Sequence, residues 1–173
     1  MKKLFLLSAM AGLFFASTAC AQQDKSKRPS PPAKATATLA GGAAVTIDYS
    51  QPALKGRTIG KDVEPNANKV WRAGANEATV FEVSKDVTVE GKALKAGKYG
   101  LYMIDKGNNN FTVIFSNKWN VWGTVYNESD DALRVDAKAS QGSSSEERLT
   151  YTVGNDGKVT LAWGTLRVVF HVK

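Results

Sequence analysis

The chain has 173 residues, of which 43% are hydrophobic and 23% are charged, and its formal net charge at pH 7 is +7. This composition excludes a wholly disordered or collagen-like chain. The charge is unevenly placed, because residues 1–35 hold six of the 23 basic residues and one of the 16 acidic ones. Residues 36–173 keep 17 basic and 15 acidic residues, a net charge of +2. Such a balance gives no basic groove, so we expect no nucleic-acid partner.

Residues 1–21 have the order of parts of an export signal. Two lysines precede an apolar run at 4–16, which is too short to span a bilayer. The single cysteine of the chain, Cys20, follows this run, as in a bacterial lipoprotein whose new N-terminal cysteine is lipidated. The alternative is ordinary cleavage after Ala21. We favour a membrane-anchored lipoprotein over a periplasmic or secreted protein, because the chain has no other cysteine, and in either case it is exported without disulfides.

Residues 22–35 are predicted to be a flexible spacer. The segment holds three of the five prolines, four basic residues and no aromatic side chain. The segment has little apolar surface to bury. We therefore expect Lys25, Lys27 and Arg28 to keep an extended spacer soluble, and not to form a binding arm. The folded domain is then expected to start at residue 36.

From residue 36 onward, apolar and polar residues alternate with period two, which is typical of β-strands. Strands are expected at 45–49, 79–83, 87–89, 99–104, 111–115, 133–138, 149–153, 159–163 and 166–172, and a Gly41-Gly42 turn is suited to join residues 36–40 to the first of them. The segment 99–104 is apolar on both faces, which favours a central strand. Asn155-Asp156-Gly157 predicts a tight hairpin turn, because Asp-Gly tolerates positive φ angles.

This pattern predicts an all-β fold, a single antiparallel β-sandwich or jelly-roll-like domain of about nine strands over residues 36–173. No long helical stripe is present outside the leader, and at most one short helical turn is expected, at 117–122.

Few residues offer metal or nucleophile chemistry. The only histidine is His171, and no thiol remains after the leader, so a zinc site is not expected. The acids at 128–131 and 146–147 could supply oxygens to calcium, but they lack the ordered spacing of a dedicated loop. We therefore expect no metal and no cofactor. His171 alternates with the apolar Phe170 and Val172, so we expect it to face solvent. The serines at 143–145 lack the glycine-serine-glycine elbow of a serine hydrolase.

The densest polar cluster runs from Trp71 to Glu77 and includes Arg72 and Asn76. A guanidinium, an amide and a carboxylate on one short loop suit recognition of a polar ligand. The alternative is structural: Arg72 pairs with Glu77 or another acid while Asn76 satisfies the backbone of a turn. From the residue types alone we favour the structural account.

A second candidate is the pair Trp119 and Trp122, with Tyr126 nearby. Exposed, the two indoles would be a stacking platform for sugar rings or an aromatic ligand. Buried, they would plug one end of a sandwich. We favour the plug, because tryptophan is usually well buried.

Several strings in this chain resemble the bacterial family known as domain of unknown function 2911. They are Asp48-Tyr49-Ser50-Gln51-Pro52, Lys55-Gly56-Arg57, the run Val70 to Thr79, Leu94 to Tyr99, Phe111 to Phe115 and Trp119 to Gly123. The resemblance extends from about Pro32 to the C-terminus, although Lys95 stands where the pattern commonly has proline. It implies an exported envelope protein, chiefly of Bacteroidota, and brings no established catalytic residues.

Three functions remain open at this point. In the first, which we favour, the protein is a non-catalytic binding module for a polar envelope or extracellular ligand, a glycan or a peptide. Its shallow pocket is expected to be lined by Arg57, Arg72, Asn76, Glu77, Tyr102 and Trp122. In the second, Glu77 and Asp48 are the carboxylates of a glycan hydrolase. In the third, the domain is a structural envelope component without a ligand. The sequence indicates no oligomeric state.

Overall fold

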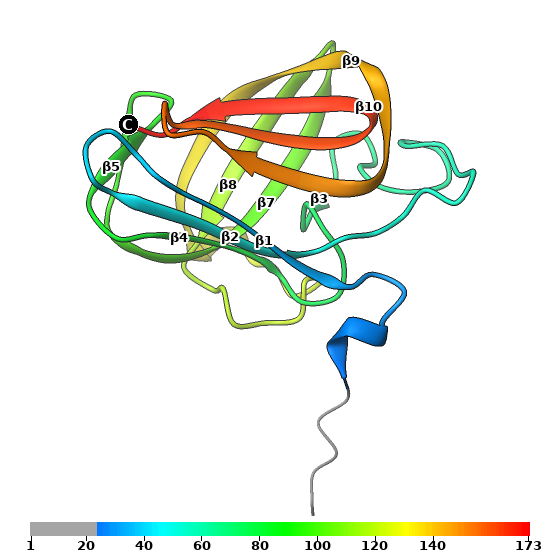
Figure 1. The fold of residues 1–173 in the computed structure, drawn as a ribbon, viewed down its shortest axis with the longest axis horizontal. Coiled ribbons are helices and arrows are strands. Elements are labelled where there is room, and N and C mark those ends of the chain that lie inside the picture. The colour runs from blue at the N-terminus through cyan, green and yellow to red at the C-terminus, as the bar shows by residue number, and fades with distance from the viewer. Residues whose placement is uncertain (1–23) are drawn as a thin grey trace, which may run out of the picture.

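The structure is a computed structural model that describes residues 24–173 (Figure 1). These residues form an all-β, mostly antiparallel fold, as the alternation predicts. The strands are β1 (Pro32–Thr38), β2 (Ala44–Ser50), β3 (Val70–Trp71), β4 (Thr79–Val83), β5 (Val87–Val89), β6 (Lys92–Leu94), β7 (Gly97–Gly107), β8 (Asn110–Ser116), β9 (Asp131–Val153) and β10 (Lys158–His171). Two 3₁₀ turns, η1 (Lys25–Lys27) and η2 (Glu128–Asp130), complete the described elements. No helix within residues 24–173 is long and apolar enough to cross a membrane.

One main sheet dominates the fold. Its strands follow the order β1-β2-β4-β7-β8-β9-β10, with β3 paired to β7, while β5 and β6 form a small separate sheet. The main sheet curls into a half-barrel, so that β9 comes back into contact with β1 and β2 (Figure 1). The expected two packed sheets of a sandwich or jelly roll are therefore replaced by a single curled sheet.

The curl depends on the length of β9 and β10. Residues 139–148, which are polar and separate two expected strands, continue β9 as one 23-residue strand. Residues 159–163 and 166–172 likewise fall on the single strand β10, apart from Val172, which makes an isolated bridge with Val89. The β9–β10 register shifts on both sides of Gly164, whose φ is +52°. Such irregularities bend a strand, and this lets one ribbon pass from one wall of the half-barrel to the other.

The predicted central strand and hairpins are confirmed. β7, which contains residues 99–104, is the fourth of the seven strands on the main path. β1 and β2 form the antiparallel hairpin expected at Gly41-Gly42, whereas the small hairpin of β5 and β6 is not predicted. β9 and β10 turn at 154–157, where Gly157 has a φ of +84°.

The concave side of the half-barrel holds the main core. Phe115 contacts Phe81 edge to face at a centroid distance of 5.0 Å and Phe170 at 6.1 Å, and Trp71 stacks on Trp163 at 6.0 Å. The convex side carries a smaller cluster of Ala78, Tyr102 and Ile114, against which Val70, Ile104, Val121 and Tyr126 pack. The loop between β8 and β9 is thereby held against the outside of the sheet.

The described N-terminal segment is more ordered than expected. β1 begins at Pro32, four residues before the predicted start of the domain. Proline is compatible with the first residue of an edge strand, and small alanines at 33, 35 and 37 turn toward the core while their neighbours face solvent. The expected helical turn at 117–122 is absent, and the 3₁₀ turn of this loop lies at η2. The predicted leader and Cys20 lie outside the described residues.

Candidate functional site

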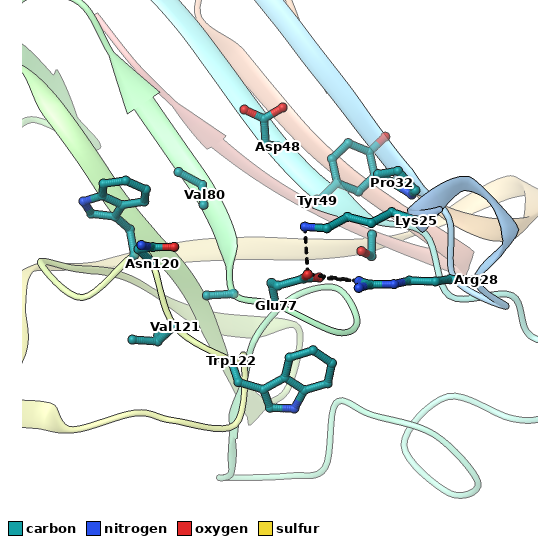
Figure 2. A pocket seen from close by; sticks show the side chains of 13 residues that line it. Lys25, Arg28, Pro32, Asp48, Tyr49, Glu77, Val80, Asn120, Val121 and Trp122 are labelled. Atoms are coloured by element: carbon teal, nitrogen blue, oxygen red, sulfur yellow. Dashed lines mark hydrogen bonds and ion pairs between the residues drawn. The ribbon is translucent and has the colours of Figure 1, made fainter. Parts of the chain in front are cut away.

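A cavity of about 450 Å³ opens on the convex side, beside β2 and β4 (Figure 2). Asp48 and Val80 are cross-strand partners in its floor, and both point away from the core because their neighbours Ile47 and Phe81 are completely buried. The walls come from the N-terminal segment, from Glu77 and from the loop that carries Trp119 and Trp122. A volume of this size is typical of a small-ligand site.

A glycine allows the tryptophan loop to lie on the sheet. Gly100 is the β7 partner of Val80, and a Cβ there would stand 2.6 Å from the carbonyl oxygen of Lys118. Further along, the Ala78 N–H donates to the carbonyl of Val121 at 3.1 Å, and Gly123 N–H donates to that of Asn76 at 3.0 Å. The loop is therefore fixed to the main chain at 76–78 and forms one wall of the cavity.

The favoured prediction of a buried tryptophan plug is wrong. Trp119 is 37% exposed and Trp122 is 51% exposed, and both line the cavity. The physical reason is that Val121 and Tyr126 already cover the apolar patch on the convex face. Trp119 also lies under the ammonium of Lys98, which is 5.3 Å from its ring centroid, a cation–π geometry.

Glu77 forms ion pairs with two basic residues at the cavity, and Figure 2 shows Lys25 and Arg28 pointing toward its carboxylate. Lys25 Nζ lies 3.0 Å from Oε1, and Arg28 Nη1 donates to Oε1 at 3.0 Å and to Oε2 at 2.9 Å. Partial burial by itself would raise the pKa of Glu77, but the hydrogen bonds from Lys25, its own backbone N–H and Arg28, with the charge of Lys25, lower it to about 2. The carboxylate is thus ionised at any neutral or mildly acidic pH.

These contacts correct the prediction that the basic residues of the spacer do not bind. Lys25 and Arg28 both pair with the folded domain. Lys27 is exposed, and among the described residues its one ion pair is with Asp24, at 3.8 Å. The Asp24 side chain caps η1 by accepting from the N–H of Ser26 at 3.0 Å. Because these contacts are polar and distant in sequence, hydrophobic patterning gives no sign of them.

The second carboxylate, Asp48, also has a basic partner. Lys34 on β1 is its register partner, and the Lys34 ammonium lies 2.9 Å from Oδ1 of Asp48. The two acids of the hydrolase hypothesis therefore line one cavity, and each carries an ion pair.

The Arg72–Asn76–Glu77 cluster divides into separate roles. Asn76 Nδ2 donates to the carbonyl of Ser30 at 3.0 Å, next to the Glu77 ion pairs. Arg72 is half-buried beneath the tryptophan loop, where a Cβ at Gly123 would collide with its side chain. Its Nε has no hydrogen-bond partner among residues 24–173. Within the described residues, Glu77 pairs with Lys25 and Arg28 and makes no ion pair with Arg72.

Two other candidate residues lie elsewhere. Tyr102 is 1% exposed, and its hydroxyl donates to the carbonyl of Val125 at 3.2 Å, so it supports the loop from below. Arg57 lines a different cavity of about 590 Å³, and its guanidinium donates to the carbonyls of Leu54 and Ala53. His171 faces solvent as predicted, with Nδ1 3.2 Å from Glu90.

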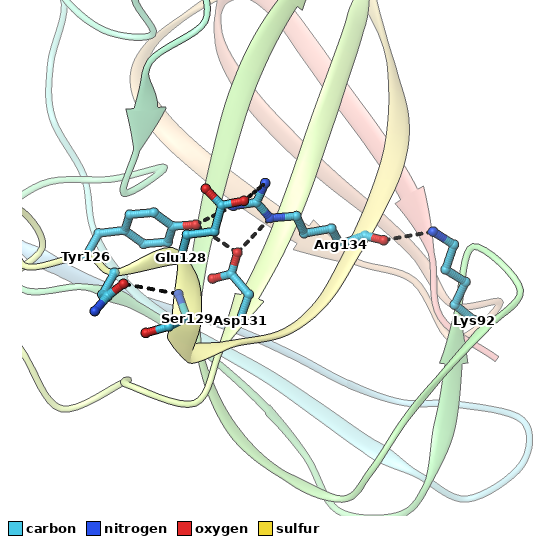
Figure 3. A network of polar contacts seen from close by, with 7 residues as sticks. Lys92, Tyr126, Glu128, Ser129, Asp131 and Arg134 are labelled. Carbon is cyan, nitrogen blue, oxygen red and sulfur yellow. Dashed lines mark hydrogen bonds and ion pairs between the residues drawn. The ribbon is translucent and has the colours of Figure 1, made fainter.

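A polar network fixes the far end of the tryptophan loop to β9 (Figure 3). The Tyr126 hydroxyl donates to Asp131 Oδ2 at 2.8 Å, and Arg134 donates to the same oxygen at 2.6 Å and to the Tyr126 oxygen at 2.7 Å. Burial and the neighbouring Asp131 carboxylate raise the pKa of Tyr126 to about 12. No group of three or more potential metal ligands occurs within residues 24–173.

The family model described as "Protein of unknown function (DUF2911)" matches residues 30–172, and the chain belongs to this family. The match includes Asp48, Glu77 and both cavity tryptophans, whereas Lys25 and Arg28 precede it. No curated protein and no solved structure matches the chain.

Proposed function

We propose that this protein is an exported, non-catalytic binding module whose ligand is a polar envelope or extracellular molecule, a glycan or a peptide. The observation that carries the proposal is the presence of two exposed indoles and an ionised carboxylate in one cavity. Large aromatic side chains are rarely left exposed together without a partner.

The chemistry of the lining suits recognition. Trp119 and Trp122 offer flat apolar faces with an N–H at one edge, and such faces stack on sugar rings or on planar groups of a peptide. Glu77 supplies a charged acceptor, and Asn120 supplies an amide with both donor and acceptor atoms. A few polar groups beside apolar faces are typical of an orienting ligand site.

Hydrolysis is the less favoured alternative. A glycosidase needs one carboxylic acid whose pKa is raised so that it holds a proton at working pH. The pKa of Glu77 is lowered to about 2, and ion pairs hold both Glu77 and Asp48. This environment favours a permanently charged acceptor over a proton donor.

Export with a lipid anchor at Cys20 is part of the proposal. It is supported by the charged start, the apolar run and the single cysteine of residues 1–21. Mass spectrometry of the N-terminus of protein purified from the envelope tests it. We expect a chain that begins with a lipidated Cys20, and an unmodified chain starting at Gln22 would contradict the anchor.

The binding function is tested by screening the exported protein against glycan and peptide arrays, then measuring affinity by tryptophan fluorescence. We expect Trp122→Ala to weaken binding at least tenfold with little change in melting temperature, because the side chain is half exposed. Val125→Ala is the matched control, since Val125 is 57% exposed on the same loop and does not line the cavity. Equal binding by wild type and Trp122→Ala, or no ligand in either array, would refute the proposal.

A further inference from the structure

The described N-terminal segment occupies one side of the cavity as a bound peptide would. Three successive carbonyl oxygens of this segment accept hydrogen bonds from the domain. Arg148 Nη1 donates to the carbonyl of Pro29 at 3.4 Å, Asn76 Nδ2 to that of Ser30 at 3.0 Å, and the Gln51 N–H to that of Pro31 at 2.9 Å. The domain therefore hydrogen-bonds to the main chain of three successive residues of the segment.

The conformation of the segment follows from its prolines. Arg28 and Ser30 each precede a proline, and a residue in that place is pushed away from helical angles toward an extended backbone. Arg28 has φ −68° and ψ 149°, close to the polyproline II values of about −75° and +145°. The extended, proline-containing segment thus borders the same cavity that Trp119 and Trp122 line. Extended proline-rich peptides bound beside aromatic side chains are a recurring mode of peptide recognition.

The side chains of the segment add a charge requirement. Lys25 and Arg28 supply the ammonium and guanidinium that satisfy Glu77. The hydrogen bonds from Lys25 and Arg28 and the charge of Lys25 help to lower the pKa of Glu77 to about 2, so the segment stabilises the ionised carboxylate. An ordinary glutamate, with a pKa of about 4.3, is also ionised at neutral pH, so a vacated site would present a negative charge to a basic ligand. A neutral glycan offers neither a cation nor a row of peptide carbonyls.

We propose that the surface formed by Gln51, Asn76 and Glu77 binds an extended, basic, proline-containing peptide. Residues 25–32 of this chain lie on that surface as an intramolecular stand-in for the ligand, and they form one wall of the cavity there. This inference rests on the proposed function and specifies its ligand. The tethered segment competes with the ligand at a high effective concentration, so that a peptide in solution binds by displacing it.

The test uses a fluorescent peptide with the sequence of residues 25–32, KSKRPSPP, and fluorescence anisotropy with the exported protein. Lys25→Ala/Arg28→Ala in the protein removes the competing cations, and we expect it to bind the peptide at least tenfold more tightly than wild type. Lys27→Ala is the matched control, because Lys27 does not contact Glu77, and it should behave as wild type.

Two further experiments test whether Glu77 recognises the positive charges of the peptide. Adding Glu77→Gln to the double variant should abolish peptide binding, and the peptide carrying Lys25→Ala and Arg28→Ala should not bind the double variant. If the double variant does not bind KSKRPSPP, or binds it equally well with Glu77→Gln, the inference is overturned.

The same assay separates this inference from the proposed function. Neutral oligosaccharides and amino-sugar oligosaccharides form the comparison panel. If an oligosaccharide binds in a Trp122-dependent way while the peptide does not, the peptide assignment is wrong and the binding module stands. If neither class binds to any variant, both proposals fall.

Discussion

The guanidinium of Arg28 donates to both carboxylate oxygens of Glu77, at 3.0 and 2.9 Å, across 49 positions of sequence. Glu77 lies just ahead of β4 and next to the tryptophan loop, whereas Arg28 precedes the first strand. This one ion pair therefore ties the N-terminal segment to the wall of the cavity. The arginine partner of Glu77 is therefore Arg28, and not Arg72, which lies nearer in sequence.

A double-mutant cycle separates the two arginines. For Arg28→Ala and Glu77→Ala we expect a coupling free energy of about 0.5–1 kcal/mol, the range of a partly exposed ion pair. For Arg72→Ala and Glu77→Ala we expect effects that add to within about 0.5 kcal/mol, because these side chains share no ion pair. Urea unfolding of the single and double variants measures both. A larger coupling for Arg72 than for Arg28 would contradict the described pairing.

The contribution of Glu77 to stability should depend on pH. Its pKa is lowered from 4.5 to about 2 by folding, so the stabilisation is complete above about pH 4.5 and is lost as the pH falls through 2. At pH 7 we expect the melting temperature of wild type to exceed that of Glu77→Gln by about 3 °C, and we expect this difference to vanish near pH 2. Thermal melts of both proteins from pH 7 to 2 check this. A difference that grows on acidification would show that the sign is wrong.

Gly100→Ala should displace the tryptophan loop. The added Cβ would stand 2.6 Å from the Lys118 carbonyl oxygen and 2.9 Å from the Tyr102 ring. We expect a loss of about 1–3 kcal/mol in the free energy of unfolding, as for other overpacked sites, together with altered fluorescence of the exposed tryptophans. Gly41→Ala is the control, because a Cβ there meets open space. Equal stability of the two variants would contradict the close approach at Gly100.

Arg134→Ala should destabilise the far end of the same loop. The Asp131 side chain is 9% exposed, so removal of Arg134 leaves a largely buried carboxylate without its cation. We expect a cost of about 2–3 kcal/mol in chemical unfolding, somewhat below that of breaking a fully buried pair. Adding Asp131→Asn should restore part of the loss, since it removes the stranded charge. A further loss in the double variant would show that Arg134 acts through other contacts.

Period-two alternation predicts the strands and the hairpins well, and the apolar run at 99–104 correctly marks the central strand. The same alternation does not predict the half-barrel. It records which face of a strand is buried, whereas the shape of the sheet depends on how far β9 and β10 run and where they bend. Residues 140–148 are mostly polar and mostly exposed although they belong to β9, so their composition alone resembles that of a loop.

The cavity is predicted only in part. Of the six expected residues, Glu77 and Trp122 line it, and the other four do not: Arg57, Arg72, Asn76 and Tyr102. Lys25 and Arg28 are missed because a pair formed between distant segments leaves no periodic pattern. The prediction that Trp119 and Trp122 are buried is wrong because it rests on the usual burial of tryptophan. In this fold Val121 and Tyr126 already cover the apolar patch on the convex face.

Docking of the N-terminal segment also determines how far an anchored domain extends from its membrane. For a chain held by a lipid at Cys20, the five residues to Lys25 span at most about 18 Å, and the twelve residues to Pro32 span at most about 43 Å. Release of the segment by a competing peptide would lengthen the free tether from five residues to twelve, so that its maximum span would more than double. Binding of a competing peptide would then also increase how far the anchored domain can move from the membrane.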